Sequence, residues 1–134
     1  MYSVEAFELT RLRLVDIYVG VPDSYLKTFI SKINELGLPH IIAVNEAHAV
    51  AIAFGCMIAG KIPCVYLQNS GLGNIINPLT SLCIPSKVEP MLVIGHRHTL
   101  EQHKLMGDID EELLKLIGYT NYIFAEGDSA NVAQ

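Results

Sequence analysis

Residues 41–60, IIAVNEAHAVAIAFGCMIAG, contain the signals that decide the fold. An apolar run of strand length, residues 41–44, is followed by Asn45, a residue favoured immediately before a helix. An alanine-rich segment of helical length then covers residues 46–59 and is stopped by Gly60. A strand, a cap and a helix in this order predict one βα unit.

The same alternation continues on both sides of this unit. The expected strands are residues 15–19, 41–44, 64–67, 91–94 and 121–124. The expected helices are residues 6–12, 24–36, 46–59 and 111–117, together with one that follows a polar loop at 68–74 and runs to residue 82. This pattern is typical of a doubly wound α/β fold, with a mostly parallel sheet and helices on both faces. Since 134 residues suffice for one core, we expect a single domain over residues 1–134.

Composition narrows the classes of function. With 51% hydrophobic residues, 17% charged residues and a net charge of -5, the chain lacks the basic character of a nucleic-acid-binding protein. No apolar stretch is long enough to cross a bilayer, and the first five residues, MYSVE, do not resemble a signal peptide. We therefore expect no nucleic acid partner, no membrane contact and a cytoplasmic location. Cys56, Cys64 and Cys83 lie in apolar surroundings without CxxC spacing, which predicts buried free thiols.

Polar and small residues gather in the segments that follow the expected strands. These segments are residues 20–24, 45–46, 68–74 and 95–103. In doubly wound sheets, ligands bind at the carboxyl ends of the strands. The four segments are therefore the expected binding site.

Glu46 is the only formally charged residue between His40 and Lys61. We expect apolar surroundings for its carboxylate, and such a group keeps a proton within reach and can do acid/base chemistry. Taken alone, the pair Asn45 and Glu46 favours an ordinary helix cap followed by a first-turn acid.

Three motifs carry a resemblance to a known family. They are VGVPDS at residues 19–24, NEAHAVA at 45–51, and QNSGLGN at 68–74 with NPL at 77–79. In this order and spacing they resemble the pyrimidine-binding domain of thiamine-diphosphate enzymes. Within that superfamily they are most similar to phosphonopyruvate decarboxylases and to the alpha subunit of sulfopyruvate decarboxylase. The resemblance implies a thiamine-diphosphate cofactor and a magnesium ion.

The resemblance also implies roles for individual residues. Glu46 matches the glutamate that hydrogen-bonds N1′ of the cofactor's aminopyrimidine, and Asp23 lies in a loop that approaches the substrate, so both are expected catalytic residues. The expected cofactor contacts are Glu46, Pro22, Gln68, Asn69, Gly71, Gly73 and Asn74. From the residues themselves, Asp23 is equally well interpreted as a helix cap.

The histidine-rich segment that begins at His96 is the expected substrate side of the site. His96 and His98 flank Arg97 at the end of a strand, so they should point to the same side. Arg97 and His103 match phosphonopyruvate decarboxylases, whereas His96 and His98 depart from them, and the sulfopyruvate enzyme is similar through His-Arg. We expect Arg97, His96 and His103 to bind substrate, because a guanidinium forks onto carboxylate, phosphonate or sulfonate oxygens. A surface role for Arg97 is equally open, and this histidine spacing is too weak a signal to predict a metal site.

The second half of such an active site is missing from these residues. Related enzymes bind magnesium and the diphosphate through Gly-Asp-Gly followed later by Asn, and Gly127-Asp128-Ser129 has too few residues after it to match. The resemblance therefore implies a diphosphate-binding beta subunit as partner, in a hetero-oligomer. The expected reaction is decarboxylation of phosphonopyruvate. Sulfopyruvate decarboxylation and a noncatalytic, regulatory subunit are the alternatives.

Overall fold

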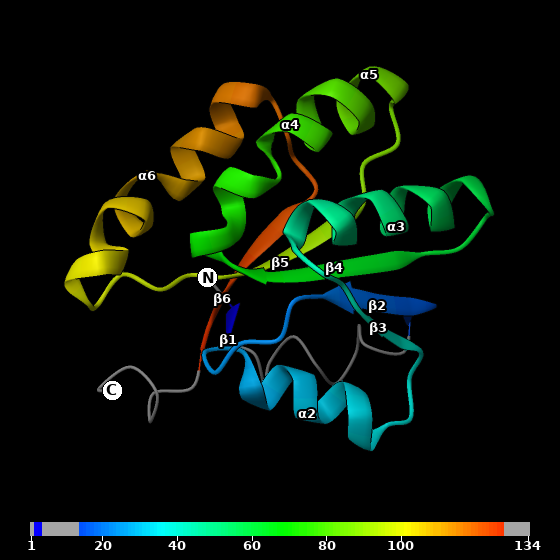
Figure 1. Cartoon of the computed structure of the whole chain (residues 1–134), viewed down its shortest axis with the longest axis horizontal. Coiled ribbons are helices and arrows are strands. Elements are labelled where there is room, and N and C mark those ends of the chain that lie inside the picture. The colour runs from blue at the N-terminus through cyan, green and yellow to red at the C-terminus, as the bar shows by residue number, and fades with distance from the viewer. Residues whose placement is uncertain (1, 4–13, 128–134) are drawn as a thin grey trace.

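The computed structural model describes residues 2–3 and 14–127, and its strands form one parallel sheet (Figure 1). The strand order is β1-β6-β5-β4-β2-β3, and every pair of neighbours is parallel. The strands are β1 (Tyr2–Ser3), β2 (Ile17–Gly20), β3 (His40–Ile42), β4 (Pro63–Gln68), β5 (Met91–Gly95) and β6 (Tyr122–Glu126). The uncharged strand β5 lies between β4 and β6, as an interior strand should.

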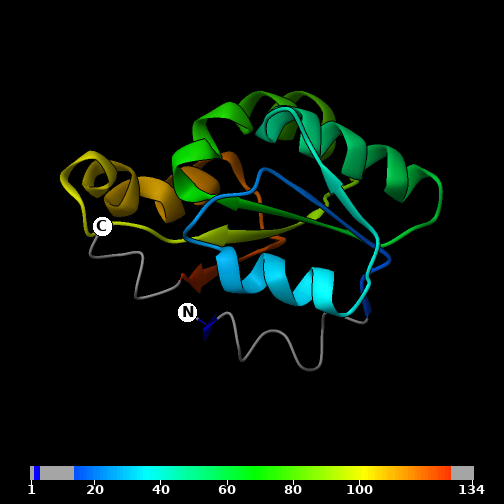
Figure 2. The same cartoon turned by 60° about the horizontal axis from the view of Figure 1, so that its bottom comes forward.

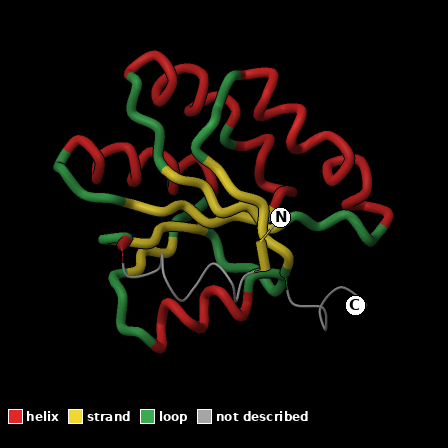
Figure 3. Tube along the Cα trace, turned by 180° about the vertical axis from the view of Figure 1, so that it is seen from behind, coloured by secondary structure: helices red, strands yellow, loops and turns green. Residues whose placement is uncertain are grey.

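Helices cover both faces of the sheet. In Figures 1 and 2, α3, α4, α5 and α6 lie on one face and α2 lies on the other. The view from behind in Figure 3 shows the strands between these two layers. The helical segments are α2 (Lys27–Glu35), α3 (Glu46–Ile58), the 3-10 helix η2 (Asn69–Asn74), α4 (Ile76–Pro78), the π-helical turn η3 (Leu79–Cys83), α5 (Ile84–Ser86) and α6 (Glu101–Ile117). The prediction of a doubly wound α/β fold is confirmed.

Two apolar clusters, one on each face, bury the sheet. Alternate residues of β4 enter different clusters: Val65 and Leu67 pack with α3, whereas Cys64 and Tyr66 pack with α2. All four side chains are fully buried. A strand that is buried on both faces has no polar alternation, which explains the continuous apolar run in this part of the sequence.

Local capping signals work as the sequence predicts. The Asn45 side chain accepts a hydrogen bond from the His48 backbone N–H at 2.9 Å, which caps α3. Gly60 adopts a φ of 84° just after α3, and Gly37 adopts a φ of 63° just after α2. Both values lie in the left-handed region that glycine tolerates best.

The five predicted strands have boundaries within two residues of those observed, β1 was not predicted, and three predictions for segments between strands need correction. The segment at 68–74 is the 3-10 helix η2 rather than a loop, apart from Gln68, which ends β4. The helix predicted to end at residue 82 continues through Ser86, with a π-helical turn between its two prolines. The predicted helix 6–12 lies outside the described residues.

The largest correction concerns α6, which begins at Glu101, ten residues before the predicted start at 111. Its first residue is preceded by Leu100, which provides no side-chain cap. Gly107 further weakens the helical signal, yet the structure uses it for close packing, because a Cβ there would lie 2.3 Å from the Cβ of His98.

The three cysteines are free thiols. Cys64 and Cys83 are buried as predicted, whereas Cys56 on α3 is partly exposed. Burial, with the charge of Glu89 nearby, raises the pKa of the Cys83 thiol to about 11, and burial raises the pKa of Cys64 as well. None of the helices in the described ranges is both long and apolar enough to cross a membrane.

Candidate functional site

The motif at 45–51 and the motif at 68–74 meet at the carboxylate of Glu46. Asn74 Nδ2 donates a hydrogen bond to Glu46 Oε2 at 2.9 Å. Gly71 lies against the same side chain, because a Cβ at this position would be 2.5 Å from Glu46 Oε1. The first turn of α3 and the helix η2 thus hold the carboxylate at the carboxyl end of the sheet.

The prediction of apolar surroundings for Glu46 is wrong for this chain by itself. Its side chain is half-buried, and it contacts an amide and a glycine. The apolar residues that precede it do not enclose it, since Ile42 and Val44 are 65% and 84% exposed. These exposures follow from the position of β3 at the edge of the sheet.

Asp23 closes the turn before α2 and does not cap the helix itself, whose N-cap is Leu26, and it retains one oxygen for another partner. Its Oδ1 accepts hydrogen bonds from the backbone N–H groups of Tyr25 at 2.7 Å and Leu26 at 3.1 Å, at the turn that leads into α2. Gln68 Nε2 donates to the same oxygen at 3.3 Å. The other oxygen, Oδ2, is buried and has no hydrogen-bond partner among the described residues. Burial raises the pKa of Asp23 above its usual range, against the opposing effects of these hydrogen bonds and of Arg97.

Relative to the parent, Asp23→Asn should stabilise the fold more at neutral pH than at acidic pH. In the interval above the usual carboxyl value, the folded protein keeps a proton that the unfolded chain has released, so stability falls as the pH rises. Asparagine cannot ionise and avoids this loss, and its Oδ1 can keep the three hydrogen bonds of Asp23. Urea unfolding at pH 4 and pH 7 measures the effect.

We subtract the unfolding free energy of the parent from that of Asp23→Asn at each pH. We expect this difference to be larger at pH 7 than at pH 4. The matched control is Asp108→Asn, which removes an exposed carboxylate paired with Lys104 at 2.8 Å and should not gain stability at pH 7. If the variant and the parent differ in unfolding free energy by the same amount at pH 4 and at pH 7, then burial does not penalise the charged form of Asp23.

Gln68 is oriented by its neighbours. Ser70 Oγ donates to Gln68 Oε1 at 2.9 Å, which leaves the amide nitrogen of Gln68 directed at Asp23. Two strand-end segments, after β2 and after β4, are therefore joined through side chains.

Arg97 also has a buried polar atom without a partner. Its Nε is buried and has no hydrogen-bond partner in the described part of the chain. Its guanidinium carbon lies 5.7 Å from the centroid of the Tyr25 ring, which is within cation–π range. Partial burial and the charge of Arg97 lower the pKa of His103, so the two substrate-side candidates are electrostatically coupled.

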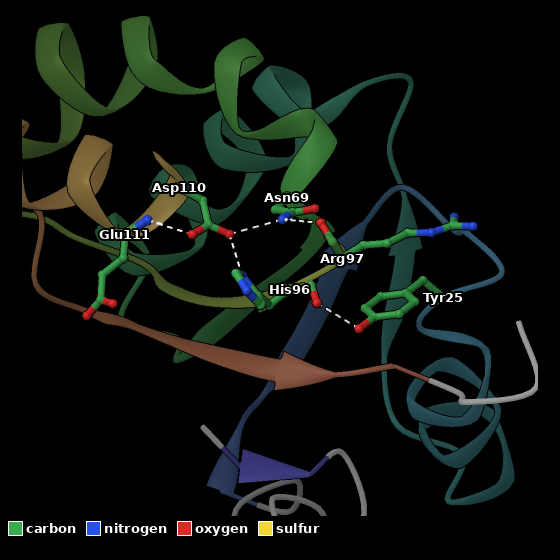
Figure 4. A network of polar contacts seen from close by, with 6 residues as sticks. All are labelled: Tyr25, Asn69, His96, Arg97, Asp110 and Glu111. Atoms are coloured by element: carbon green, nitrogen blue, oxygen red, sulfur yellow. Dashed lines mark hydrogen bonds and ion pairs between the residues drawn. The ribbon is translucent and has the colours of Figure 1, made fainter. Parts of the chain in front are cut away.

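His96 contacts a group that sequence reasoning missed. Figure 4 shows His96 Nδ1 facing Asp110, whose Oδ2 lies 2.6 Å away. Asn69 Nδ2 donates to the same oxygen at 3.0 Å. Asp110 is only 2% exposed and belongs to α6. As expected, His96 and His98 lie on the same side, with ring centroids 4.8 Å apart.

A signal for Asp110 was present in the sequence. Met106, Leu113 and Ile117 pack against the core, and Asp110 falls between them at helical spacing. A carboxylate on the apolar face of a helix needs a buried partner. The predicted helix began at 111, so the pattern was not visible.

The other candidates are less closely tied together. Pro22 and Gly73 are exposed, and a Cβ at Gly73 would meet no more distant atom of the described residues within 4 Å. His48 is exposed on α3 and accepts a hydrogen bond from the Val44 backbone, which suits a helix-face residue. In the part of the chain that the structure describes, no three His, Cys, Asp or Glu side chains are arranged to hold a metal ion.

Comparisons with known proteins agree on one family. The family described as thiamine pyrophosphate enzyme, N-terminal TPP binding domain, matches residues 7–116. A phosphonopyruvate decarboxylase from Streptomyces viridochromogenes is 37% identical over 108 residues, which are 76% of this chain and 27% of that protein. The alpha subunit of sulfopyruvate decarboxylase from Methanocaldococcus jannaschii is 35% identical over 89 residues, which are 66% of this chain and 53% of that protein. The chain thus spans between about a quarter and a half of these two curated relatives.

A solved structure supports the fold. The 2-oxoglutarate:ferredoxin oxidoreductase from Magnetococcus marinus superposes with a TM-score of 0.63 at 18% identity. The match covers 77% of this chain and 19% of that chain. At this level of identity the likeness concerns the arrangement of strands and helices.

Proposed function

Because this chain belongs to the thiamine pyrophosphate enzymes, as their N-terminal TPP-binding domain, we propose that it is the pyrimidine-binding part of a thiamine-diphosphate-dependent decarboxylase of 2-oxo acids. The proposed substrate is phosphonopyruvate, which yields phosphonoacetaldehyde and carbon dioxide. Sulfopyruvate, which yields sulfoacetaldehyde, is the second candidate, because several relatives are named as alpha subunits of sulfopyruvate decarboxylase.

One observation carries the proposal. Glu46 comes from one motif, and Gly71 and Asn74 come from another, more than twenty residues further along the chain, yet they meet at one carboxylate. Only Oε2 of that carboxylate is hydrogen-bonded among the described residues. Oε1 is therefore free to hydrogen-bond a cofactor and to exchange a proton with it.

The residues fit thiamine diphosphate. The cofactor, when bound, supplies the electron sink for loss of carbon dioxide from a 2-oxo acid. Glu46 Oε1 would hydrogen-bond its pyrimidine ring, and the open space beside Gly73 leaves room for a ligand. The other residues assigned to the cofactor are Pro22, Gln68, Asn69, Gly71 and Asn74.

The substrate side is assigned to Asp23, Arg97, His96 and His103. The buried Oδ2 of Asp23 and the buried Nε of Arg97 both lack partners in the described residues, and a buried polar atom is stable only when it is hydrogen-bonded. An anionic substrate would supply oxygens to both. Since burial raises the pKa of Asp23, its protonated form persists to higher pH and can donate to such an oxygen.

The proposal includes a diphosphate-binding beta subunit that holds Mg²⁺. The support is that several relatives are named as alpha subunits of sulfopyruvate decarboxylase, a name that implies a second kind of subunit. The exposed apolar residues Ile42, Val44 and Ile58 suit a hetero-oligomeric contact. We also assign the complex to the cytoplasm, since three unpaired thiols suit a reducing compartment.

The test is carbon dioxide release by the chain copurified with its diphosphate-binding partner. Phosphonopyruvate and sulfopyruvate are supplied separately, with and without thiamine diphosphate and Mg²⁺, and the aldehyde product is identified. We expect release that needs the cofactor, with phosphonopyruvate the better substrate. Preference for sulfopyruvate would move the assignment to the second candidate. A stable complex that releases nothing from either acid would contradict the proposal and favour a noncatalytic role.

A further inference from the structure

Asp110 is a buried carboxylate with no assigned role, and both of its oxygens are engaged. Its Oδ2 lies 2.6 Å from His96 Nδ1 and accepts from Asn69 Nδ2 at 3.0 Å. Its Oδ1 accepts from the backbone N–H of Glu111 at 2.7 Å. Figure 4 shows these contacts converging on the one side chain from α6, β5 and η2.

With Asp110 ionised, this arrangement selects one neutral form of the His96 ring. The Asn69 amide nitrogen and the Glu111 backbone N–H can only donate, so two of the three partners of Asp110 require an acceptor. An ionised Asp110 satisfies all three if His96 carries a hydrogen on Nδ1. The ring is then left with Nε2 as its free nitrogen.

The same network fixes the backbone that carries the substrate-side candidates. Asn69 Nδ2 also donates to the carbonyl of Arg97 at 2.9 Å, and the Tyr25 hydroxyl donates to the carbonyl of His96 at 2.7 Å. Two consecutive carbonyls are thus anchored by side chains from different elements. The His96 ring is further confined by an edge contact with Phe124, at 5.5 Å between centroids.

We propose that Asp110 is a positioning residue, which fixes His96 as the Nδ1–H tautomer and presents its Nε2 to the substrate. It also acts through Asn69 on the backbone of Arg97. The consequence for turnover rests on the proposed decarboxylase function, but the tautomer of His96 does not. A buried acid that orients a histidine through Nδ1 leaves the other nitrogen available for hydrogen bonding or proton transfer.

Imidazole ¹⁵N NMR of the full chain tests the tautomer directly, with His96→Gln identifying the His96 signals. We expect the hydrogen on Nδ1 in the parent protein. In Asp110→Asn, the asparagine oxygen can keep the Glu111 N–H while its amide nitrogen takes the place of Oδ2 and donates to His96 Nδ1, so the hydrogen should move to Nε2. Asp108→Asn, an exposed change two residues away on α6, should leave the signals unchanged. An Nε2–H tautomer in the parent would overturn the proposal, whatever Asp110→Asn shows.

Kinetics of the reconstituted complex test the consequence. Asp110→Asn should lower kcat by about tenfold to a hundredfold, the loss seen when a group that orients a metal-binding histidine is removed from a metalloenzyme. Asp108→Asn should keep the parent kcat. In a His96→Gln background, the further loss from Asp110→Asn should be much smaller, because the two residues act as one unit. Equal losses in the two backgrounds would show that Asp110 does not act through His96 and would overturn the proposal.

The two proposals fail in different ways. If the parent complex releases no carbon dioxide, the decarboxylase assignment fails, while the NMR result still decides the Asp110–His96 pairing. If the parent complex is active and Asp110→Asn matches Asp108→Asn in kcat, the decarboxylase assignment stands and the positioning role is wrong.

Discussion

Glu46→Gln is expected to lower the turnover of the reconstituted complex by roughly 10²- to 10⁴-fold, the range for loss of a positioned acid/base group. The carboxyl of Glu46 can hold or release a proton at Oε1, and an amide cannot. Glutamine keeps the contact with Asn74, because its amide oxygen can accept the hydrogen bond that Glu46 Oε2 accepts at 2.9 Å. The fold should therefore survive, and the loss should appear in kcat with saturating cofactor.

The matched control is Glu112→Gln. Glu112 is an exposed residue of α6, and the same carboxylate-to-amide change there should leave kcat within twofold or so, the scale of other surface changes. Circular dichroism and urea unfolding of both variants check the fold. If Glu46→Gln turns over as fast as the parent, Glu46 does not have the proposed acid/base role.

Gly71→Ala should also reduce kcat, by about a hundredfold, although it adds only one methyl group. The new Cβ would lie 2.5 Å from Glu46 Oε1 and 2.6 Å from its Cδ. These atoms end a half-buried side chain that can rotate away, so the free energy of unfolding should change by less than about 1 kcal/mol, below the usual range for overpacking a core. The carboxylate is displaced instead, and a displacement of about 1 Å in an active site can cost that much in rate.

Gly73→Ala provides the comparison within the same 3-10 helix. A Cβ at this position would meet no more distant atom within 4 Å in the part of the chain that the structure describes, so Glu46 stays in place. We expect the parent kcat at saturating cofactor, and any contact of the new methyl group with the cofactor should appear as a higher concentration needed for saturation. A parent-level kcat for Gly71→Ala would show that the position of Glu46 does not depend on Gly71.

The elements that sequence patterns predicted well are those with local causes. The run at 64–67 is apolar throughout because β4 is covered on both faces, so the sequence alone predicts a buried strand there. Asn45 caps α3 through a contact only three residues along the chain. The first turn of α3 and the position of Glu46 could therefore be predicted to the residue.

The features that sequence patterns missed depend on distant parts of the chain. Asp110 meets His96 and Asn69 only because α6 packs beside them, although they are 14 and 41 residues away in the sequence. The exposure of Glu46 depends on β3 being an edge strand. The order of strands in a sheet cannot be predicted from the local sequence pattern. Local apolar composition was a poor guide in that case, because the apolar neighbours point to solvent.

The cysteines differ in burial, so their reactivity can report when the sheet opens. Alkylating reagents attack the thiolate, so partly exposed Cys56 should be labelled first, in the folded state. Cys64 belongs to β4 in the middle of the sheet and becomes reactive only when that strand separates from its neighbours. Mass spectrometry of a labelling time course would therefore separate reaction of the folded chain at Cys56 from opening of the sheet at Cys64, with no engineered probe.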